Sequence, residues 1–441
     1  MKLTFLQNKE VKNAGWLISE QVFGMFLSLL VGLLTARYLG PSNYGALNYT
    51  ASFVAFFVPF ATLGMEGVVI KKLILRPQDE GTYLGSCILF RLGSSVICMA
   101  GVTWLMYVLN PDDTIKACLV AIQSFQLAFR SVHVLDSWFR RHLKSKYVSI
   151  GKMVAAVVVA TYKVVLLVCN KSIIWFAFSN TLSDCMIALM MYLFYNREKT
   201  QKLRFRFHLG GEVFAESYHF VISGLVSVLY TQMDKIMIGH YLQDEDVGLY
   251  TTALTICGLW TFVPLAVINS FTAKIMELKN SGNEMQYRRR LCQLYSFVIW
   301  LCLVVAVIIT LLGRFIIQIL YGDAYLGAVP SLQIAVWFET FSMIGSCRSI
   351  WVLCENKNKY VKYYLGIGAA VNLVLNAMLI SLWGIRGAAL ATLVTQFVTA
   401  IVAPMLFRQT RAHTRLVWDA FTCRWWFERR RNENKRDFEK K

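Results

Sequence analysis

The segment NREKTQKLRFRFHLGG, residues 196–211, is basic and poor in apolar residues, and it lies between two long halves that are hydrophobic almost throughout. Its five cations are Arg197, Lys199, Lys202, Arg204 and Arg206. No run within the segment is long enough to cross a bilayer, so the positive-inside bias places it on the cytoplasmic surface. We therefore predict a cytoplasmic linker at residues 196–212 that divides the chain into two bundles. Two interpretations of its charge stay open: a solvated linker without a partner, or a segment that binds anionic lipid.

Outward from this segment, the composition is that of a membrane protein. The 441 residues are 56% hydrophobic and 16% charged, whereas a soluble domain is about half apolar and about a quarter charged. A net charge of +19 would suggest nucleic acid in a soluble protein, but these cations lie in the breaks between apolar blocks, where they set orientation. Most of the 11 cysteines fall inside apolar runs without metal-ligand spacing. We therefore expect no nucleic acid, no metal and no other cofactor.

Apolar blocks long enough to cross about 30 Å of hydrocarbon as helices can be marked off along the whole chain. In the first half they run near residues 14–36, 45–64, 82–108, 114–135, 147–169 and 173–195. In the second half they run near residues 213–240, 248–270, 291–313, 329–353, 361–382 and 387–407. We therefore predict an all-α polytopic membrane protein with about 12 transmembrane helices in two six-helix lobes. The expected domains are an N-terminal lobe at 1–195, the linker at 196–212, a C-terminal lobe at 213–407 and a basic cytoplasmic tail at 408–441.

The distribution of charge and an internal repeat support this division. Most of the 45 lysines and arginines fall in alternate loops, in the linker and in the tail, so both termini are expected in the cytoplasm. The pattern at Tyr38–Gly45, Tyr-Leu followed by a glycine, recurs at Tyr241–Gly248. Each copy precedes a helix with one mid-span proline, Pro59 or Pro264. Repeated six-helix halves are a transporter architecture.

Charged residues inside the predicted spans are the candidate functional residues, because a charge at mid-bilayer costs a few kcal/mol and faces a cavity or a partner. The cations within spans are Arg91, Arg130, Lys152, Lys163, Lys235 and Arg348. The deep anions are Asp184, Asp234, Glu20 and Glu339. We predict that the cations line a cavity that binds an anionic substrate, and that the carboxylates are candidates for coupling to a proton or sodium ion.

Lys152 and Lys163 carry this prediction furthest. They are 11 residues apart, so they lie within about 20° of the same helix face and about 16 Å apart along the axis. One helix therefore presents a ladder of two cations. The alternatives are that Lys152, Arg130 and Arg348 snorkel to the inner surface, and that the carboxylates neutralise buried cations.

Several stretches in order along the chain resemble a known family. They are RYLGPSNYG at Arg37–Gly45, DKIMIGHYLQDEDVGLY at Asp234–Tyr250 and GIRGAALAT at Gly384–Thr392. Together with the predicted spans, they resemble the O-antigen and capsular polysaccharide flippases (Wzx-like), in the polysaccharide transporter family of the multidrug/oligosaccharidyl-lipid/polysaccharide exporter superfamily.

The resemblance implies a flippase of the bacterial inner membrane that works by alternating access in O-antigen, capsule or exopolysaccharide assembly. Its cargo would be an undecaprenyl-diphosphate-linked oligosaccharide repeat unit, and its partners the lipid bilayer, a polysaccharide polymerase and a chain-length regulator. Buried arginine and lysine suit a diphosphate. Two alternatives stay open: an ion-coupled multidrug exporter of the same superfamily, which should favour acidic cavity residues, and a membrane enzyme of polysaccharide assembly. The loops are too short for a catalytic domain and carry no convergent catalytic site, so we do not expect an enzyme.

Overall fold

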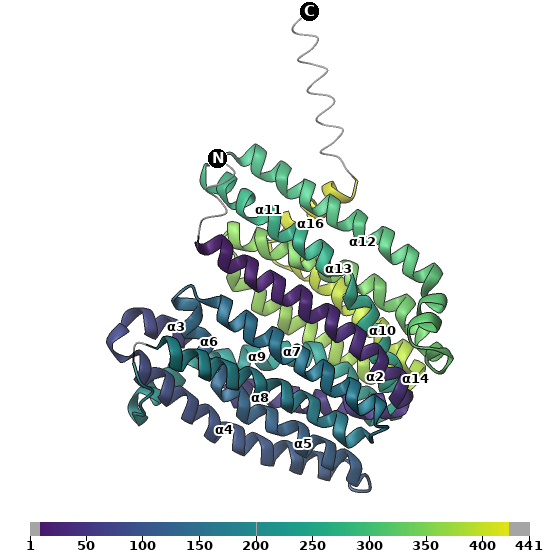
Figure 1. Cartoon of the computed structure of the whole chain (residues 1–441). Coiled ribbons are helices and arrows are strands. Elements are labelled where there is room, and N and C mark those ends of the chain that lie inside the picture. Colours follow the sequence, from purple (N-terminus) through teal and green to yellow (C-terminus); the bar gives the residue numbers. More distant parts are fainter. Residues whose placement is uncertain (1–8, 200, 423–441) are drawn as a thin grey trace, which may run out of the picture. The chain divides into compact units, whose positions relative to one another are not determined.

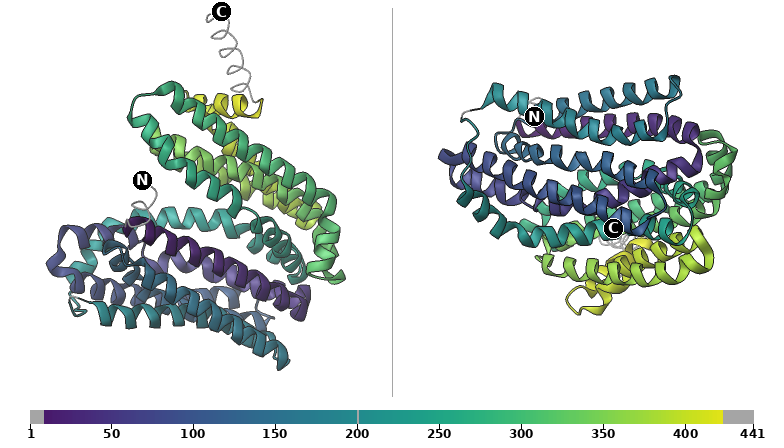
Figure 2. Two further views of the ribbon diagram at one scale, coloured as in Figure 1. Left: turned by 45° about the horizontal axis from the view of Figure 1, so that its top comes forward. Right: turned by 90° about the horizontal axis from the view of Figure 1, so that it is seen from below.

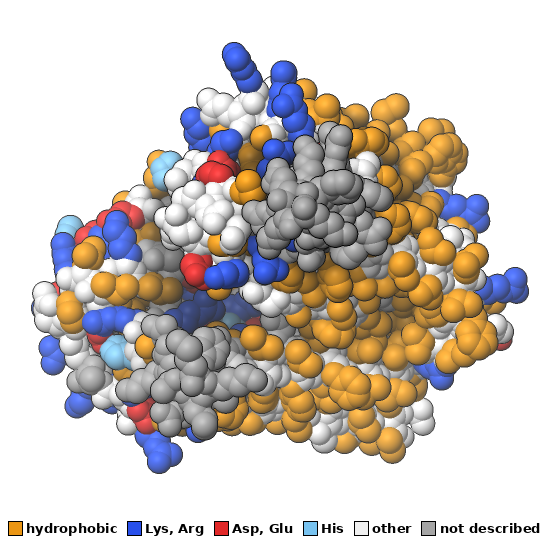
Figure 3. Space-filling view, turned by 90° about the horizontal axis from the view of Figure 1, so that it is seen from above, with side chains coloured by type: hydrophobic (Ala, Val, Ile, Leu, Met, Phe, Trp, Pro, Cys, Tyr) orange, Lys and Arg blue, Asp and Glu red, His pale blue; other side chains and the backbone are white. Residues whose placement is uncertain are grey.

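The computed structural model of the chain describes residues 9–199 and 201–422. These residues are almost entirely helical and contain no strand, which confirms the predicted all-α class (Figure 1). They pack as two compact units, Met1–Ile236 and Met237–Lys441. Hydrophobic side chains cover much of the face seen in Figure 3, as expected for helices that face hydrocarbon.

Unit 1 is a bundle of long helices joined by short turns. Its elements are α2 (Lys9–Thr62), α3 (Glu66–Leu75), η1 (Pro77–Asp79), α4 (Glu80–Leu109), α5 (Thr114–Arg130), η2 (Ser131–Val134), α6 (Leu135–Arg141), α7 (Ser145–Val168), α8 (Ile173–Glu198) and α9 (Phe207–Tyr241). α5 packs between α4 and α8, α8 packs against α7, and α7 packs against α2. The interior of unit 1 is therefore enclosed by several spans, and charged groups on their inner faces can meet.

Unit 2 has the same kind of construction. Its elements are α10 (Asp244–Leu259), α11 (Phe262–Asn280), α12 (Glu284–Leu320), η3 (Asp323–Ala328), α13 (Val329–Cys354), η4 (Asn358–Tyr360), α14 (Val361–Phe397), η5 (Val398–Val402), α15 (Ala403–Leu406) and α16 (Arg411–Phe421). α13 packs against α12 and α14, and α12 also packs against α11. Figure 2 (left) shows α16, in yellow, as a short helix at the end of the long helices of this unit.

Two of the longest helices are each broken by a glycine. Gly40 in α2 has φ 72° and ψ 168°, and Gly384 in α14 has φ 58° and ψ −138°. A left-handed φ is cheap only for glycine, and Pro41 removes a backbone N–H directly after the first break. Each break separates two predicted spans.

The described part of the chain contains nine helices that are long and apolar enough to cross a membrane, and α13 is not one of them. The count of twelve spans stays a prediction.

The basic segment between α8 and α9 is bound to α4 along its backbone. The Arg204 N–H donates to the Gly81 carbonyl at 3.1 Å. The Ser86 hydroxyl donates to the Arg206 carbonyl at 3.0 Å, and the Arg206 N–H donates to the same hydroxyl at 2.9 Å. A Cβ on Gly85 would lie 2.4 Å from the Arg204 carbonyl oxygen, so this close approach requires glycine. The backbone is therefore not a solvated linker, although the side chains of Lys202, Arg204 and Arg206 are exposed.

α9 follows this segment and touches α2 and α3 at separate points. A Cβ on Gly224 would lie 3.0 Å from Pro59 Cβ, and the Ser52 hydroxyl donates to Gln232 Oε1 at 3.1 Å. Nearer the start of α9, Lys72 Nζ is 2.7 Å from Glu212 Oε1 and also contacts Glu216. The division by packing therefore falls at residues 236 and 237, near the end of α9. The domain boundaries expected from the sequence stay a prediction.

Candidate functional site

A cluster of ionisable side chains lies inside unit 1, where α5, η2 and α8 meet. Arg130 Nε is 2.8 Å from Asp184 Oδ2. His133 Nε2 is 3.8 Å from Asp184 Oδ1 and 3.4 Å from its backbone carbonyl oxygen. The Asp184 side chain is 10% exposed and that of Arg130 is 33% exposed. One carboxylate is therefore shared by a guanidinium and an imidazole in a largely dry environment.

The local backbone explains how Arg130 and His133 reach the same carboxylate. α5 ends at Arg130 and continues as the 3₁₀ turn η2 before α6 begins. In a 3₁₀ turn, residues i and i+3 lie directly above one another, which aligns these two side chains. A 3₁₀ stretch within a longer helix is often a functional hinge. His133 was not among the residues that the sequence singled out, because only lysine, arginine, aspartate and glutamate were counted as charges within the spans.

Arg91 lies on the buried face of α4. The side chain is fully buried, and none of its three guanidinium nitrogens has a hydrogen-bond partner among the residues that the structure describes. On the next turn the Ser95 hydroxyl donates to the Leu127 carbonyl at 2.9 Å and lies 3.2 Å from Ser131 Oγ. α4 is therefore fixed against the end of α5 and the start of η2. A buried guanidinium without a hydrogen-bond partner costs several kcal/mol, so Arg91 is a candidate to bind an anion or water.

The two lysines of α7 differ in their partners. Lys152 Nζ is 3.6 Å from Glu20 Oε2 of α2, so this lysine has the internal ion pair that was one of the alternatives. Lys163, on the same face further along α7, is half-buried and makes no ion pair or hydrogen bond with a described residue. Of the two lysines in the predicted ladder, only Lys152 therefore has an anionic partner among the described residues.

The remaining predicted residues lie outside this cluster. Asp234 is buried and Lys235 is half-buried near the end of α9, and the ion pairs described above for the Arg130–Asp184 cluster are formed by other residues. Arg348 on α13 donates to the Thr399 carbonyl and lies over the Tyr364 ring, 4.7 Å from its centroid. Glu339 is nine residues earlier on the same helix, so it points to the opposite face. Arg348 and Glu339 therefore do not pair with each other.

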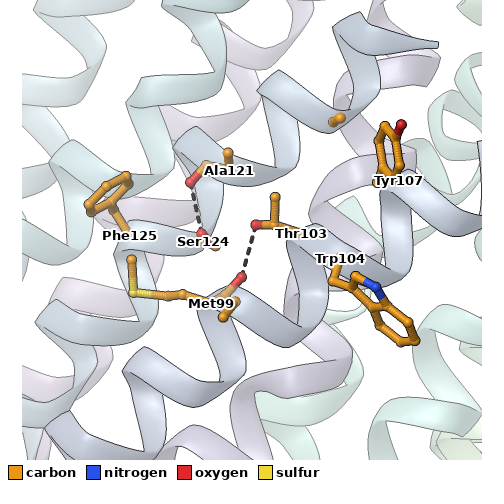
Figure 4. A pocket seen from close by; sticks show the side chains of 9 residues that line it. Met99, Thr103, Trp104, Tyr107, Ala121, Ser124 and Phe125 are labelled. Carbon is orange, nitrogen blue, oxygen red and sulfur yellow. Dashed lines mark hydrogen bonds between the residues drawn. The ribbon is translucent and has the colours of Figure 1, made fainter. Parts of the chain in front are cut away.

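Unit 1 also has an apolar groove between α4 and α5, with a volume of about 580 Å³ (Figure 4). It is lined by Met99, Ala100, Thr103, Trp104, Tyr107, Ala117, Ala121, Ser124 and Phe125. The Thr103 hydroxyl donates to the Met99 carbonyl, and the Ser124 hydroxyl donates to the Ala121 carbonyl, each at 2.8 Å. The groove therefore offers hydrocarbon rather than polar groups. In the described part of the chain, no group of three or more His, Cys, Asp or Glu side chains is placed to hold a metal ion.

Comparison with known proteins defines the family. Residues 34–330 match the model of a family described as polysaccharide biosynthesis protein. The chain belongs to this family. The resemblance to polysaccharide transporters is therefore confirmed at the level of the family.

The relatives and solved structures agree with this assignment. Lipid II flippase MurJ of Bacillus subtilis is 23% identical over 430 residues, covering 84% of this chain and 78% of the relative. Probable flippase AglR of Haloferax volcanii is 25% identical over 185 residues, covering 41% of this chain and 39% of the relative. A structure of lipid II flippase MurJ in an inward closed conformation has a TM-score of 0.72 at 15% identity, covering 93% of this chain and 91% of that chain. An inward-facing MATE family multidrug resistance transporter of the MOP superfamily has a TM-score of 0.64 at 14% identity, covering 89% and 95%. The chain therefore has the fold of MOP superfamily transporters.

Proposed function

We propose that the protein is a flippase that moves a polyprenyl-diphosphate-linked oligosaccharide across the cytoplasmic membrane by alternating access. Membership of a polysaccharide biosynthesis family supports the cargo class, and relatives named as flippases support the type of movement. The observation that carries the proposal is the pair of cations, Arg91 and Lys163, that lie within apolar helices of unit 1 and make no hydrogen bond or ion pair with a described residue. An anionic headgroup is the ligand that such cations favour.

The chemistry of the cluster suits a diphosphate. Each phosphate oxygen can accept charge-assisted hydrogen bonds from a guanidinium or an ammonium group, and such bonds are strengthened where water is excluded. Arg130 can contribute only when its hold on Asp184 is loosened, because the carboxylate competes for the same guanidinium. Protonation of Asp184 would loosen it, and this step would couple transport to a proton gradient. Asp234, Glu20 and Glu339 remain further candidates for ion coupling.

The pairing of the carboxylates favours this proposal over a multidrug exporter, the alternative that the fold shared with a multidrug transporter raises. A site for cationic drugs needs carboxylates that are free of internal cations. In unit 1, Asp184 is paired with Arg130 and Glu20 is paired with Lys152. The charges that remain without an ion pair among the groups named here are Arg91 and Lys163, both positive. This favours an anionic cargo over a cationic drug.

The finer assignments rest on the sequence resemblance. They are the undecaprenyl carrier, assembly of O-antigen or another surface polysaccharide, action with a polymerase and a chain-length regulator, and a bacterial inner membrane location with both termini in the cytoplasm. We propose transport rather than an enzymatic reaction in this assembly.

The test is transport of a fluorescent polyprenyl-diphosphate oligosaccharide in proteoliposomes without ATP. We expect flipping that responds to an imposed proton gradient and that is inhibited by polyprenyl diphosphate but not by cationic drugs. Asp184→Asn should flip at a rate that no longer responds to the gradient, because residue 184 can no longer exchange a proton. Inhibition by cationic drugs alone would contradict the proposed cargo. An undiminished response in Asp184→Asn would remove Asp184 from the coupling mechanism.

A further inference from the structure

α16 is an amphipathic helix whose outer face is not uniformly polar. His413, Leu416, Val417 and Ala420 form its buried face against unit 2. On the opposite side Arg411 and Arg415 are exposed, and so is Trp418, at 66% of its surface. Exposing the large apolar ring of Trp418 to water alone would be unfavourable, so its position beside the two arginines indicates a partner at this surface. Its 11 residues are also too few to cross a bilayer.

Contacts with α12 fix the position of α16. The Ser296 hydroxyl donates to the Ala420 carbonyl at 2.6 Å, and Arg288 donates to Asp419 Oδ2 at 2.8 Å. Because Asp419 is paired in this way, it does not neutralise Arg411 or Arg415. Arg411 Nε donates to the Met405 carbonyl at 2.9 Å, which leaves the other two nitrogens of its guanidinium for a ligand. The helix is therefore held in place on unit 2, with both arginines exposed at the surface.

The exposed side chains of α16 divide into two edges. At 100° per residue, Phe421, Trp418, Arg411 and Arg415 follow one another across an arc of about 120°, with the aromatic residues at one edge, the arginines at the other, and Trp418 about 20° from Arg411. The aromatic edge continues onto α12, because the rings of Phe421 and Trp300 stack in parallel with centroids 5.9 Å apart. Trp300 is itself 47% exposed on a helix apolar enough to cross a membrane. The aromatic edge thus runs without a break into surface that faces hydrocarbon.

We propose that Arg411, Arg415, Trp418, Phe421 and Trp300, here called the α16 surface, bind an anionic phospholipid. The rings of Trp418 and Phe421 lie at the boundary between headgroups and acyl chains, where tryptophan is enriched, and the ring of Trp300 lies further along the predicted span, among the acyl chains. The guanidinium groups of Arg411 and Arg415 bind the phosphate of the headgroup. The inference does not rest on the proposed transport function.

The observations favour a lipid over an acidic protein segment as the occupant. A basic edge beside an aromatic edge, on a helix too short to span, is the pattern of helices that lie in the membrane interface. Positive-inside orientation places this end of α12 at the cytoplasmic leaflet, whose surface is anionic. An acidic protein segment would match the arginines, but it would leave the exposed aromatic edge without a partner.

The test compares the full-length protein in nanodiscs of phosphatidylcholine alone and of phosphatidylcholine with phosphatidylglycerol. Phosphatidylglycerol should raise the thermal unfolding midpoint of the wild type, because the bound lipid stabilises only the folded state. Arg411→Gln/Arg415→Gln should lose most of this increase. The matched control is Lys359→Gln/Lys362→Gln, which removes the same charge from exposed positions elsewhere in unit 2, and it should keep the increase.

Native mass spectrometry gives an independent measure that does not depend on unfolding. The wild type and the lysine control should retain more phosphatidylglycerol than the arginine variant, and Trp418→Ala should retain less than the wild type. Equal retention by all variants would overturn the proposal, and so would an equal loss in the lysine control, which would indicate only general attraction. Stabilisation of the wild type by poly-glutamate but not by phosphatidylglycerol would assign the surface to an acidic protein and would also overturn it.

Discussion

Lys163 is the residue on which the proposed transport mechanism depends most directly. Lys163→Ala should lose most transport while the protein still inserts, because a diphosphate would lose a cationic partner at a depth where water replaces it poorly. Lys163→Arg should keep part of the activity, since the charge survives although its geometry changes. The measurement is display of surface polysaccharide in a flippase-deleted host that expresses each variant at the same level.

Lys152 provides the matched control for this experiment. Lys152→Ala should do less harm, because this lysine already has Glu20 as a partner and lies about a turn from the inner end of its predicted span. Full display by Lys163→Ala would show that the lysine does not bind the cargo. Poor insertion of both the alanine and the arginine variant would instead assign Lys163 a role in folding.

His413 links pH to the stability of unit 2. The imidazole is fully buried, its Nε2 is 3.0 Å from the Tyr295 hydroxyl, and burial together with the charge of Arg348 lowers its pKa to about 3. An unfolded histidine has a pKa of about 6.5, so the unfolded state binds more protons between these two values. The full stability is therefore present above about pH 6.5 and decreases by about 1.4 kcal/mol for each pH unit below it.

Thermal unfolding between about pH 7 and about pH 5 checks this prediction. The wild type should lose stability as the pH falls, and His413→Phe should lose less, because a phenyl ring cannot bind a proton. Tyr295 and Arg348, which face the imidazole, do not change charge in this range. The same acid sensitivity in His413→Phe would place its origin elsewhere.

At the level of residues, the sequence identified charged groups better than it identified their partners. It marked Arg130 and Asp184 as buried charges, and it left open whether such carboxylates neutralise cations; these two do pair. It gave no reason to choose His133, because a histidine was not counted as a charge and its neighbour Asp184 comes from a different helix, α8. Partners depend on how helices far apart in the sequence come together, and the pattern within one span does not contain this information.

At the level of elements, the attachment of the basic segment to α4 can be tested through one glycine. In Gly85→Val, the new Cβ would meet the Arg204 carbonyl oxygen at 2.4 Å, so the segment should detach. Trypsin should then cleave after Lys202 or Arg204 faster than in the wild type. Gly93→Val is the matched control, because it changes the same helix at a position with no atom within 4 Å. Equal cleavage rates in both variants would mean that the segment tolerates the side chain and is held elsewhere.

Elements were more predictable than their packing. Runs of apolar residues located the long helices because the bilayer imposes their length. α16 was expected only as part of a charged tail, since its 11 residues alternate apolar and charged positions around the helix. The docking of the basic segment was also not expected, because it depends on two glycines of α4 that no charge pattern singles out.

At the level of the whole molecule, the orientation in the membrane can be tested by cysteine accessibility on a cysteine-free background. Cysteines at the positions of Asp244 and Asp323 should be labelled from outside, and those at the positions of Lys202 and Arg289 only from inside. The reason is the concentration of lysine and arginine in alternate loops. Labelling of the Lys202 position from the periplasmic side would contradict the twelve-span arrangement.

The attachment of the basic segment to α4 also determines where the chain can pivot. A solvated linker between the halves would let each move without turning the other, and this was one of the two interpretations of the segment predicted at residues 196–212. With that backbone hydrogen-bonded to α4, the segment supplies no slack, and α9 continues from it as one uninterrupted helix to Tyr241. The next interruption of helical backbone is at Leu242 and Gln243, where Gln243 is extended at φ −105° and ψ 164°. In the proposed transport cycle, the backbone between the two units can therefore bend near the end of α9, where the division falls, or at this two-residue step, and not at the basic segment.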